Sequence, residues 1–215
     1  MSGRITALKV QEHNTQRVNV YLDGEFAFGL SRITAAWLRL GQELSDEKVS
    51  ELQNQDAVEV AYQKALQLLE RRPRAEAEIR RSLNKHDMPE EVIEAVMERL
   101  RRSGLVNDEQ FARTWVENRT EFRPRSRRAL AAEMRQHGLT HETIQQTLSE
   151  TDLDEEAIAY QAGLKQSRKL SQLEWLDFRR KLSAFLARRG FGYEVIAPVV
   201  QRIWKEIQSE HEEEN

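Results

Sequence analysis

Few of the side chains that commonly catalyse reactions or bind metals stand at the spacings those roles require. His137 and His141 are four residues apart, a spacing that metal sites use on helices, but Gly138 and Thr140 interrupt the span and no third ligand is near in sequence. Gly190–Gly192 is too short for a phosphate-binding glycine loop. No Ser, His and acid combination suited to nucleophilic catalysis stands out. We therefore expect no metal, no cofactor and no enzymatic activity, which counts against an enzyme acting on nucleic acid.

Arginine is the residue type whose placement does predict a chemistry. Planar guanidinium groups match the oxygens of phosphates, and several such contacts give a strongly salt-dependent affinity for nucleic acid. The candidate binding residues form three clusters: Arg72, Arg74, Arg80 and Arg81; Arg123, Arg125, Arg127 and Arg128; and Arg179, Arg180, Lys181, Arg188 and Arg189. Their target could be nucleic acid, an acidic groove of a protein partner, or solvent alone. We favour nucleic acid or a nucleoprotein.

The net charge hides this clustering. The chain has 33 Lys and Arg against 36 Asp and Glu, a formal net charge of −3, which taken alone argues against a nucleic-acid-binding protein. Residues 123–135 nevertheless contain five arginines and a single acid, and residues 165–190 contain eight basic residues and two acids. Residues 136–164 contain acids and no Lys or Arg. Such charge blocks can attract a polyanion even when the total is close to neutral.

The first 31 residues have the pattern of β-strands. Apolar residues nearly alternate from Ile5 to Val10, from Val18 to Leu22 and from Phe26 to Leu30, as expected of three half-buried antiparallel strands. Asp23-Gly24 supplies the residues that a tight hairpin turn needs. Helical spacing follows, with Ile33, Trp37, Leu38 and Leu40 before Gly41, and a second helix opening at Ser45. The sequence predicts a small N-terminal module of strands and helices.

The rest of the chain is helical and repetitive. A shift of 51 residues places Ile79 on Leu130 and Leu83 on Met134, and a further shift of 52 places these on Leu182 and Leu186. A period near 50 residues indicates a supersecondary unit used three times. Each copy divides into three helices, the second opening with a capping box at Asn107 and Gln110. Pro198 falls inside the last predicted helix, where we expect a kink or a late start.

The fold class is therefore mostly α: three tandem three-helix repeats in an elongated, curved array, preceded by the strand and helix module. The expected boundaries are 1–54 for the N-terminal module, 55–106, 107–152 and 153–208 for the repeats, and 209–215 for an acidic tail.

Composition excludes several other classes. The chain has no cysteine, so disulfides, thiolate metal sites and cysteine nucleophiles are excluded, and a reducing compartment is expected. No apolar run approaches the roughly 18 residues of a membrane span, and the start resembles no signal peptide. We expect a cytoplasmic protein without a membrane partner, acting as a monomer.

The segment Gly104–Val116, continuing to Arg119, resembles the RecX family of bacterial recombination regulators. The resemblance extends through Pro124 to Leu139, recurs more weakly at Arg188–Phe191 and, with the triplicated unit, covers about residues 57–205. The N-terminal module looks like an extension that longer members carry. The resemblance implies a non-enzymatic protein that binds the RecA recombinase filament on single-stranded DNA and modulates it, usually inhibiting strand exchange and ATP hydrolysis.

Within that interpretation we expect the contact to be made by Arg125, Arg127, Arg128, Arg179, Arg180 and Lys181. Phe111 and Trp115 would only hold the second repeat together. The competing hypothesis is a stand-alone helical DNA-binding module, similar to helix-turn-helix domains, that acts without RecA. Direct DNA binding with sequence preference would favour that module, whereas loading that depends on RecA would favour the regulator.

Overall fold

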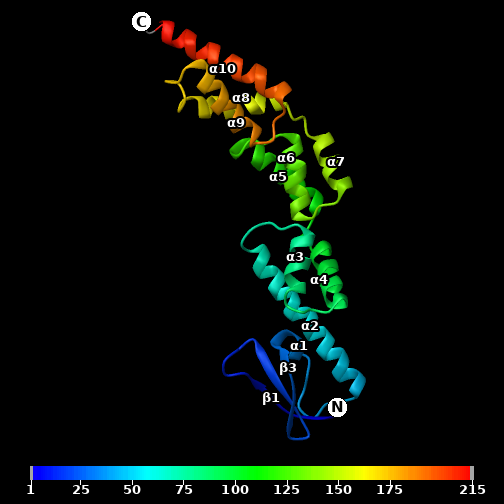
Figure 1. Cartoon of the computed structure of the whole chain (residues 1–215). Coiled ribbons are helices and arrows are strands. Elements are labelled where there is room, and N and C mark those ends of the chain that lie inside the picture. The colour runs from blue at the N-terminus through cyan, green and yellow to red at the C-terminus, as the bar shows by residue number, and fades with distance from the viewer. Residues whose placement is uncertain (1, 214–215) are drawn as a thin grey trace. The chain divides into compact units, whose positions relative to one another are not determined.

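The computed structural model describes the backbone of residues 2–213 and side chains up to Ser209. The chain divides after Val106 into two compact units, a first unit ending at Val106 and a second unit starting at Asn107. Figure 1 shows strands only in the first unit and helices in both. The predicted fold class, mostly helical with an N-terminal antiparallel sheet and three three-helix repeats, is confirmed.

The sheet contains the three predicted strands, β1 (Gly3–Val10), β2 (Arg17–Leu22) and β3 (Glu25–Ser31). A two-residue strand, β4 (Glu43–Leu44), was not predicted and pairs with the start of β1, giving the antiparallel order β3-β2-β1-β4. Asp23 and Gly24 take φ values of 50° and 92°, as a tight hairpin turn requires. The alternating residues of the strands, among them Ile5, Val20 and Leu30, are buried beneath the first half of a long helix.

The helix expected before Gly41 is shorter than predicted. α1 (Arg32–Ala35) makes one turn only. Gly41 then donates a 2.8 Å backbone hydrogen bond to the carbonyl of Ile5, and Ile5 donates one of 2.8 Å to that of Gln42. The chain must return to the sheet edge here, and this non-local pairing stops the helix although its apolar spacing continues.

Helix α2 (Asp46–Leu69) starts at the predicted cap, Ser45, whose side chain accepts a hydrogen bond from the amide of Lys48. It runs for 24 residues, so the predicted boundary after residue 54 lies inside one continuous helix. Its buried Asp56 pairs with Arg17 of β2 at 3.0 Å and accepts from the amide of Ser31. The first half of α2 therefore carries the sheet, and its second half belongs to the first repeat.

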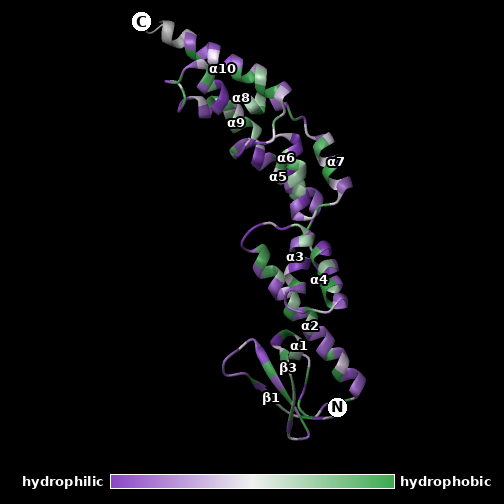
Figure 2. Cartoon of the chain, viewed as in Figure 1, coloured by the Kyte–Doolittle hydropathy of each residue, from purple (hydrophilic) through white to green (hydrophobic). Residues whose placement is uncertain are grey.

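The repeats comprise α2 with α3 (Glu76–Asn84) and α4 (Glu90–Arg102); α5 (Asp108–Phe122), α6 (Arg127–His137) and α7 (His141–Glu150); and α8 (Glu155–Ser167), α9 (Trp175–Ala187) and α10 (Tyr193–Glu213). Figure 2 shows hydrophobic residues interspersed with hydrophilic ones along the helices. Residues that the repeat alignment makes equivalent are buried in all three copies: Ile79, Leu130 and Leu182; Leu83, Met134 and Leu186; Ile93, Ile144 and Ile196; and Met97, Leu148 and Val200.

Three local predictions differ from the structure. Asn107 caps α5 by accepting from the amide of Gln110 at 2.9 Å, but the Gln110 side chain contacts Thr114, so only half of the capping box forms. Helix α10 begins at Tyr193 and continues through Pro198, so a late start is wrong. The acidic tail predicted at 209–215 begins within α10, and residues 214–215 lie outside the described residues.

A buried carboxylate in the first repeat gives the fold a predictable pH dependence. Glu59 is 6% exposed and accepts from Arg99 at 2.7 Å and from Gln63 at 2.9 Å. Burial alone would raise its pKa, but the hydrogen bonds from Arg99 and Gln63 outweigh burial and hold the pKa below its ordinary value. Because the pKa of Glu59 is lower in the folded state than in the unfolded state, its ionised carboxylate stabilises the fold at pH values above the unfolded-state pKa. That stabilisation is lost as the pH falls through the folded-state pKa.

We therefore expect Glu59→Gln to lower the melting temperature at pH 7, with the difference from the unmodified chain shrinking as the pH falls below about 4. Thermal unfolding of the variant and the unmodified chain at pH 7 and pH 3 measures the difference in melting temperature at each pH. Glu98→Gln is the matched control, because Glu98 is 63% exposed and 3.9 Å from Arg102. A Glu59→Gln difference of equal size at both pH values would contradict the assignment.

Candidate functional site

The four predicted arginines of the first repeat are held by groups within their own unit. Arg72 and Arg74 lie 2.6 and 3.4 Å from Glu78. Arg80 pairs with both Glu90 and Glu94 of α4. Arg81 donates to the carbonyl of Ala77 at 3.0 Å. Arg72 and Arg74 share one acid of their own unit and Arg80 pairs with two, so this cluster presents less free charge to a polyanion than its four arginines suggest.

The side chains of two arginines of the second unit join its two repeats. Arg125 donates to the carbonyl of Arg188 at 3.0 Å and pairs with Glu133 at 3.2 Å, while Arg189 donates back to the carbonyl of Pro124 at 3.2 Å. The amide of Ser126 also donates to the carbonyl of Arg189 at 3.1 Å. Burial, with repulsion from Arg125 and Arg188, lowers the pKa of Arg189. We call this set of reciprocal contacts the arginine clasp.

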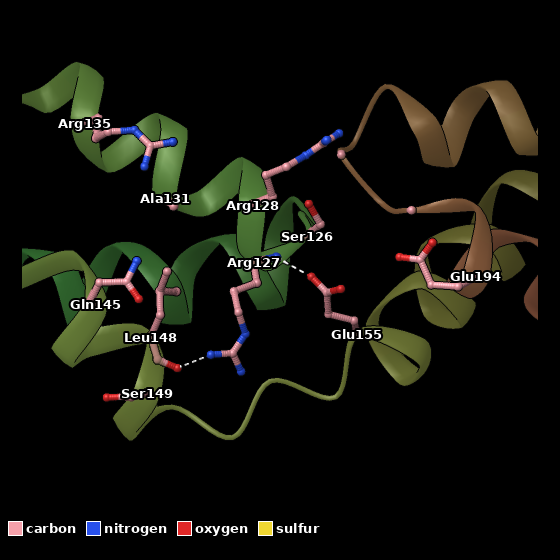
Figure 3. Close-up of a pocket in the computed structure, with 12 residues that line it drawn as sticks. Ser126, Arg127, Arg128, Ala131, Arg135, Gln145, Leu148, Ser149, Glu155 and Glu194 are labelled. Carbon is pink, nitrogen blue, oxygen red and sulfur yellow. Dashed lines mark hydrogen bonds between the residues drawn. The ribbon is translucent and has the colours of Figure 1, made fainter. Parts of the chain in front are cut away.

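Arg127 is a second structural arginine. Its amide donates to the Glu155 carboxylate and its guanidinium to the carbonyl of Leu148, at the end of α7. Figure 3 shows these two bonds, with the Arg127 side chain directed toward α7. Of the six residues expected to carry the contact, Arg125 and Arg127 are therefore engaged inside the fold.

The remaining predicted residues are exposed. We call them the free basic set: within the part of the chain that the structure describes, their side chains form no ion pair, and they are Arg123, Arg128, Arg179, Lys181 and Arg188. Arg180 is 72% exposed as well, but it pairs with Asp177 at 2.8 Å. The free basic set lies at the end of α5, at the start of α6 and along α9.

Arg128 also lines a cavity of about 520 Å³ between the second and third repeats. The same face of α6 contributes Ala131 and Arg135, and Figure 3 shows Arg128 and Arg135 both projecting from this helix. Glu155 and Glu194 are the acids in the lining. Arg127 lines the cavity too, but its guanidinium is bonded to the Leu148 carbonyl. The guanidinium groups of Arg128 and Arg135 can bind phosphate oxygens or carboxylates.

Arg135 was not among the predicted residues, although the sequence contains a signal for it. It follows Arg128 by seven residues, which is two helical turns, so the two side chains share one face of α6. It is exposed and, among the described residues, makes no ion pair. A comparison between repeats does not reveal this residue, because its signal is the spacing within a single helix.

His137, one of the two histidines four residues apart, packs against aromatic rings. The His137 ring packs 4.3 Å from the Trp115 ring and 5.3 Å from that of Phe111, measured between centroids. Within the described residues, no group of three His, Cys, Asp or Glu side chains is placed to hold a metal ion. His137 thus belongs to an aromatic cluster.

Among the described residues, no helix has the length and apolar character to cross a membrane.

Comparisons with known proteins cover nearly the whole chain. Residues 3–45 match the regulatory protein RecX N-terminal domain, and residues 61–100, 107–148 and 154–200 match the first, second and third RecX three-helix domains. A regulatory protein RecX from Bacillus velezensis is 31% identical over 98% of this chain and 81% of its own length. One from Geobacillus kaustophilus is 33% identical over 92% and 76%.

Two solved structures have the same fold. A crystal structure of regulatory protein RecX superposes with a TM-score of 0.68 at 24% identity, covering 93% of this chain and 98% of the other. A crystal structure of RecX from Lactobacillus salivarius gives 0.59 at 20% identity, covering 69% and 97%. With four matched domains and relatives above 30% identity, this chain belongs to the RecX family of regulatory proteins.

Proposed function

We propose that this chain binds the RecA filament on single-stranded DNA in the cytoplasm and inhibits strand exchange and ATP hydrolysis, without being an enzyme. The observation that carries the proposal is the free basic set on α5, α6 and α9, of which Arg128 lines a cavity together with Arg135. Exposed guanidinium groups without internal partners retain their charge for an external anion. Membership of the RecX family supplies the regulatory context.

Both signs of charge suit a filament made of nucleic acid and protein. Arg128 and Arg179 would contact phosphates or acidic protein groups, whereas Asp152 and Glu156, which do not line the cavity beside Arg128, would contact other surfaces. Charge complementarity of this kind chiefly accelerates association and fixes orientation. The proposed contact residues are the free basic set together with Arg135 and Arg180; the arginine clasp and Arg127 position them.

A stand-alone helical DNA-binding module is the second candidate, because the free basic set would serve bare DNA as well. The two proposals differ in whether RecA is required. Titrating the purified chain into a RecA strand-exchange reaction, with ATP hydrolysis measured in parallel, tests the first. Inhibition at concentrations where the chain does not coat bare single-stranded DNA is the expected result. Binding to bare DNA with sequence preference, and no effect on RecA, would favour the module.

A further inference from the structure

Helix α1 and the segment from it to Gly41 expose three large apolar side chains. Trp37 is 87% exposed, Ile33 62% and Leu40 67%. Ala35 is buried and Leu38 packs against the sheet core on the other side of the same segment. Backbone hydrogen bonds from Ala36 to Ile33 and from Leu38 to Ala35 keep the chain coiled, so Ile33 and Trp37 turn outward together.

Exposed apolar residues are ordinary when single, but a contiguous group marks an interaction surface. Trp37 is the most exposed large hydrophobic residue among those the structure describes, and its ring makes no aromatic or cation contact with any described residue. Two arginines flank it in the chain, Arg32 and Arg39, both exposed and outside every ion pair of the described residues. We call Arg32, Ile33, Trp37, Arg39 and Leu40 the Trp37 ridge.

The charge beside this ridge is also positive. Arg32 and Ile33 line a cavity of about 510 Å³, together with residues of the loop before β2 and of α2. Its charged lining residues are Arg17, Arg32, Lys64 and Glu59. Glu59 is neutralised by Arg99, and Arg17 by Asp56. Arg32 and Lys64 are left to attract negative groups of whatever covers the ridge.

The chemistry of the ridge distinguishes protein from nucleic acid as its partner. A base-stacking platform needs aromatic faces in series beside cations, and this segment offers one aromatic ring between two aliphatic side chains. Trp and Arg surrounded by aliphatic residues are instead typical of the centre of a protein interface, where a few side chains carry most of the binding free energy. The partner that fits is a protein surface with an apolar pocket edged by carboxylates.

We propose that the Trp37 ridge anchors the N-terminal unit on an acidic, apolar protein surface of the filament, while the second unit contacts anions through the free basic set. The inference rests on the proposed function, because it takes the filament as the source of that surface. It assigns the N-terminal module a share of the affinity that is independent of DNA phosphates.

The test compares Trp37→Ser with the unmodified full-length chain by fluorescence anisotropy. The two probes are labelled oligo(dT) alone and the same oligo(dT) coated with RecA. Loss of a hot-spot side chain is expected to weaken binding to the coated oligonucleotide about thirtyfold. Binding to bare oligo(dT) and the melting temperature should not change, since Trp37 supports no buried contact. Trp37→Phe should restore most of the affinity.

Val10→Ser is the matched control, because Val10 is 53% exposed in the same unit but outside the ridge. Equal filament binding by Trp37→Ser and the unmodified chain would overturn the inference and leave the proposed function standing. An equal loss on bare oligo(dT) would replace it with a nucleic-acid contact. A self-associating chain that Trp37→Ser makes monomeric would replace it with a dimer interface. Failure of the unmodified chain to bind the coated oligonucleotide would overturn the proposed function itself.

Discussion

Reversing the charges of Arg128 and Arg179 together (R128E/R179E) is expected to weaken binding to RecA-coated single-stranded DNA about a hundredfold, without changing the melting temperature. Both side chains are exposed and pair with no acid of the described residues, so their replacement removes attraction without breaking an internal contact. If they bind phosphates, the slope of log affinity against log salt should also fall, by about 0.7 for each single-strand phosphate that the variant no longer neutralises. Fluorescence anisotropy at several salt concentrations measures affinity and slope together.

The matched control reverses two charges outside the proposed site. Arg71 and Lys85 are exposed residues of the first unit, also without an ion pair among the described residues, so R71E/K85E changes the net charge by the same amount. If the affinity depended only on total charge, both double variants would lose it equally, which would contradict the site.

Unlike either double variant, Arg127→Glu should lower the melting temperature, because it removes the hydrogen bond to the Leu148 carbonyl.

The difference between Arg127 and Arg128 shows where sequence reasoning about the site fails. The two residues are adjacent, and neither composition nor repeat register separates them. Both line the same cavity, but the structure separates them because one helical position directs the Arg127 guanidinium to the Leu148 carbonyl near the end of α7, whereas the Arg128 side chain forms no ion pair among the described residues. Likewise, Arg125 finds its carbonyl partner 63 residues away in sequence. Pairings at such separations depend on how the helices pack, and a single sequence carries no direct signal for them.

The repeats, in contrast, could be predicted because their signal is local. Apolar residues recur at helical spacing within each copy, and the burial of Ile79, Leu130 and Leu182 follows from that spacing alone. The same rule predicts too long a helix before Gly41, where the backbone bond between Gly41 and Ile5 overrides the apolar spacing. Trp37, which that spacing would place in a helix, is exposed as a consequence. Non-local contacts thus account for both the missed helix end and the surface it creates.

Gly190→Ala is expected to destabilise the second unit by about 3 kcal/mol, a large effect for the addition of one methyl group. Gly190 follows Arg189 in the arginine clasp and has φ of +94°, in the left-handed region that an L side chain rarely adopts. A Cβ there would lie 2.5 Å from Ser126 Oγ and 2.7 Å from Ala129 Cβ, at the first turn of α6. Relieving that overlap must move the turn away from α6, or α6 away from the turn.

Gly104→Ala separates the two causes. Gly104 has φ of +68°, but a Cβ there meets nothing within 4 Å, so its substitution should cost only the backbone strain, about 1 kcal/mol. Urea unfolding of both variants measures the difference between their free energies of unfolding. Because the clasp sets where Arg128 stands relative to α9, Gly190→Ala should also weaken filament binding under conditions where the variant is fully folded, whereas Gly104→Ala should not. Equal stability losses would mean that the turn at Gly190 yields freely, and that the clasp does not fix the position of the basic residues on the two repeats.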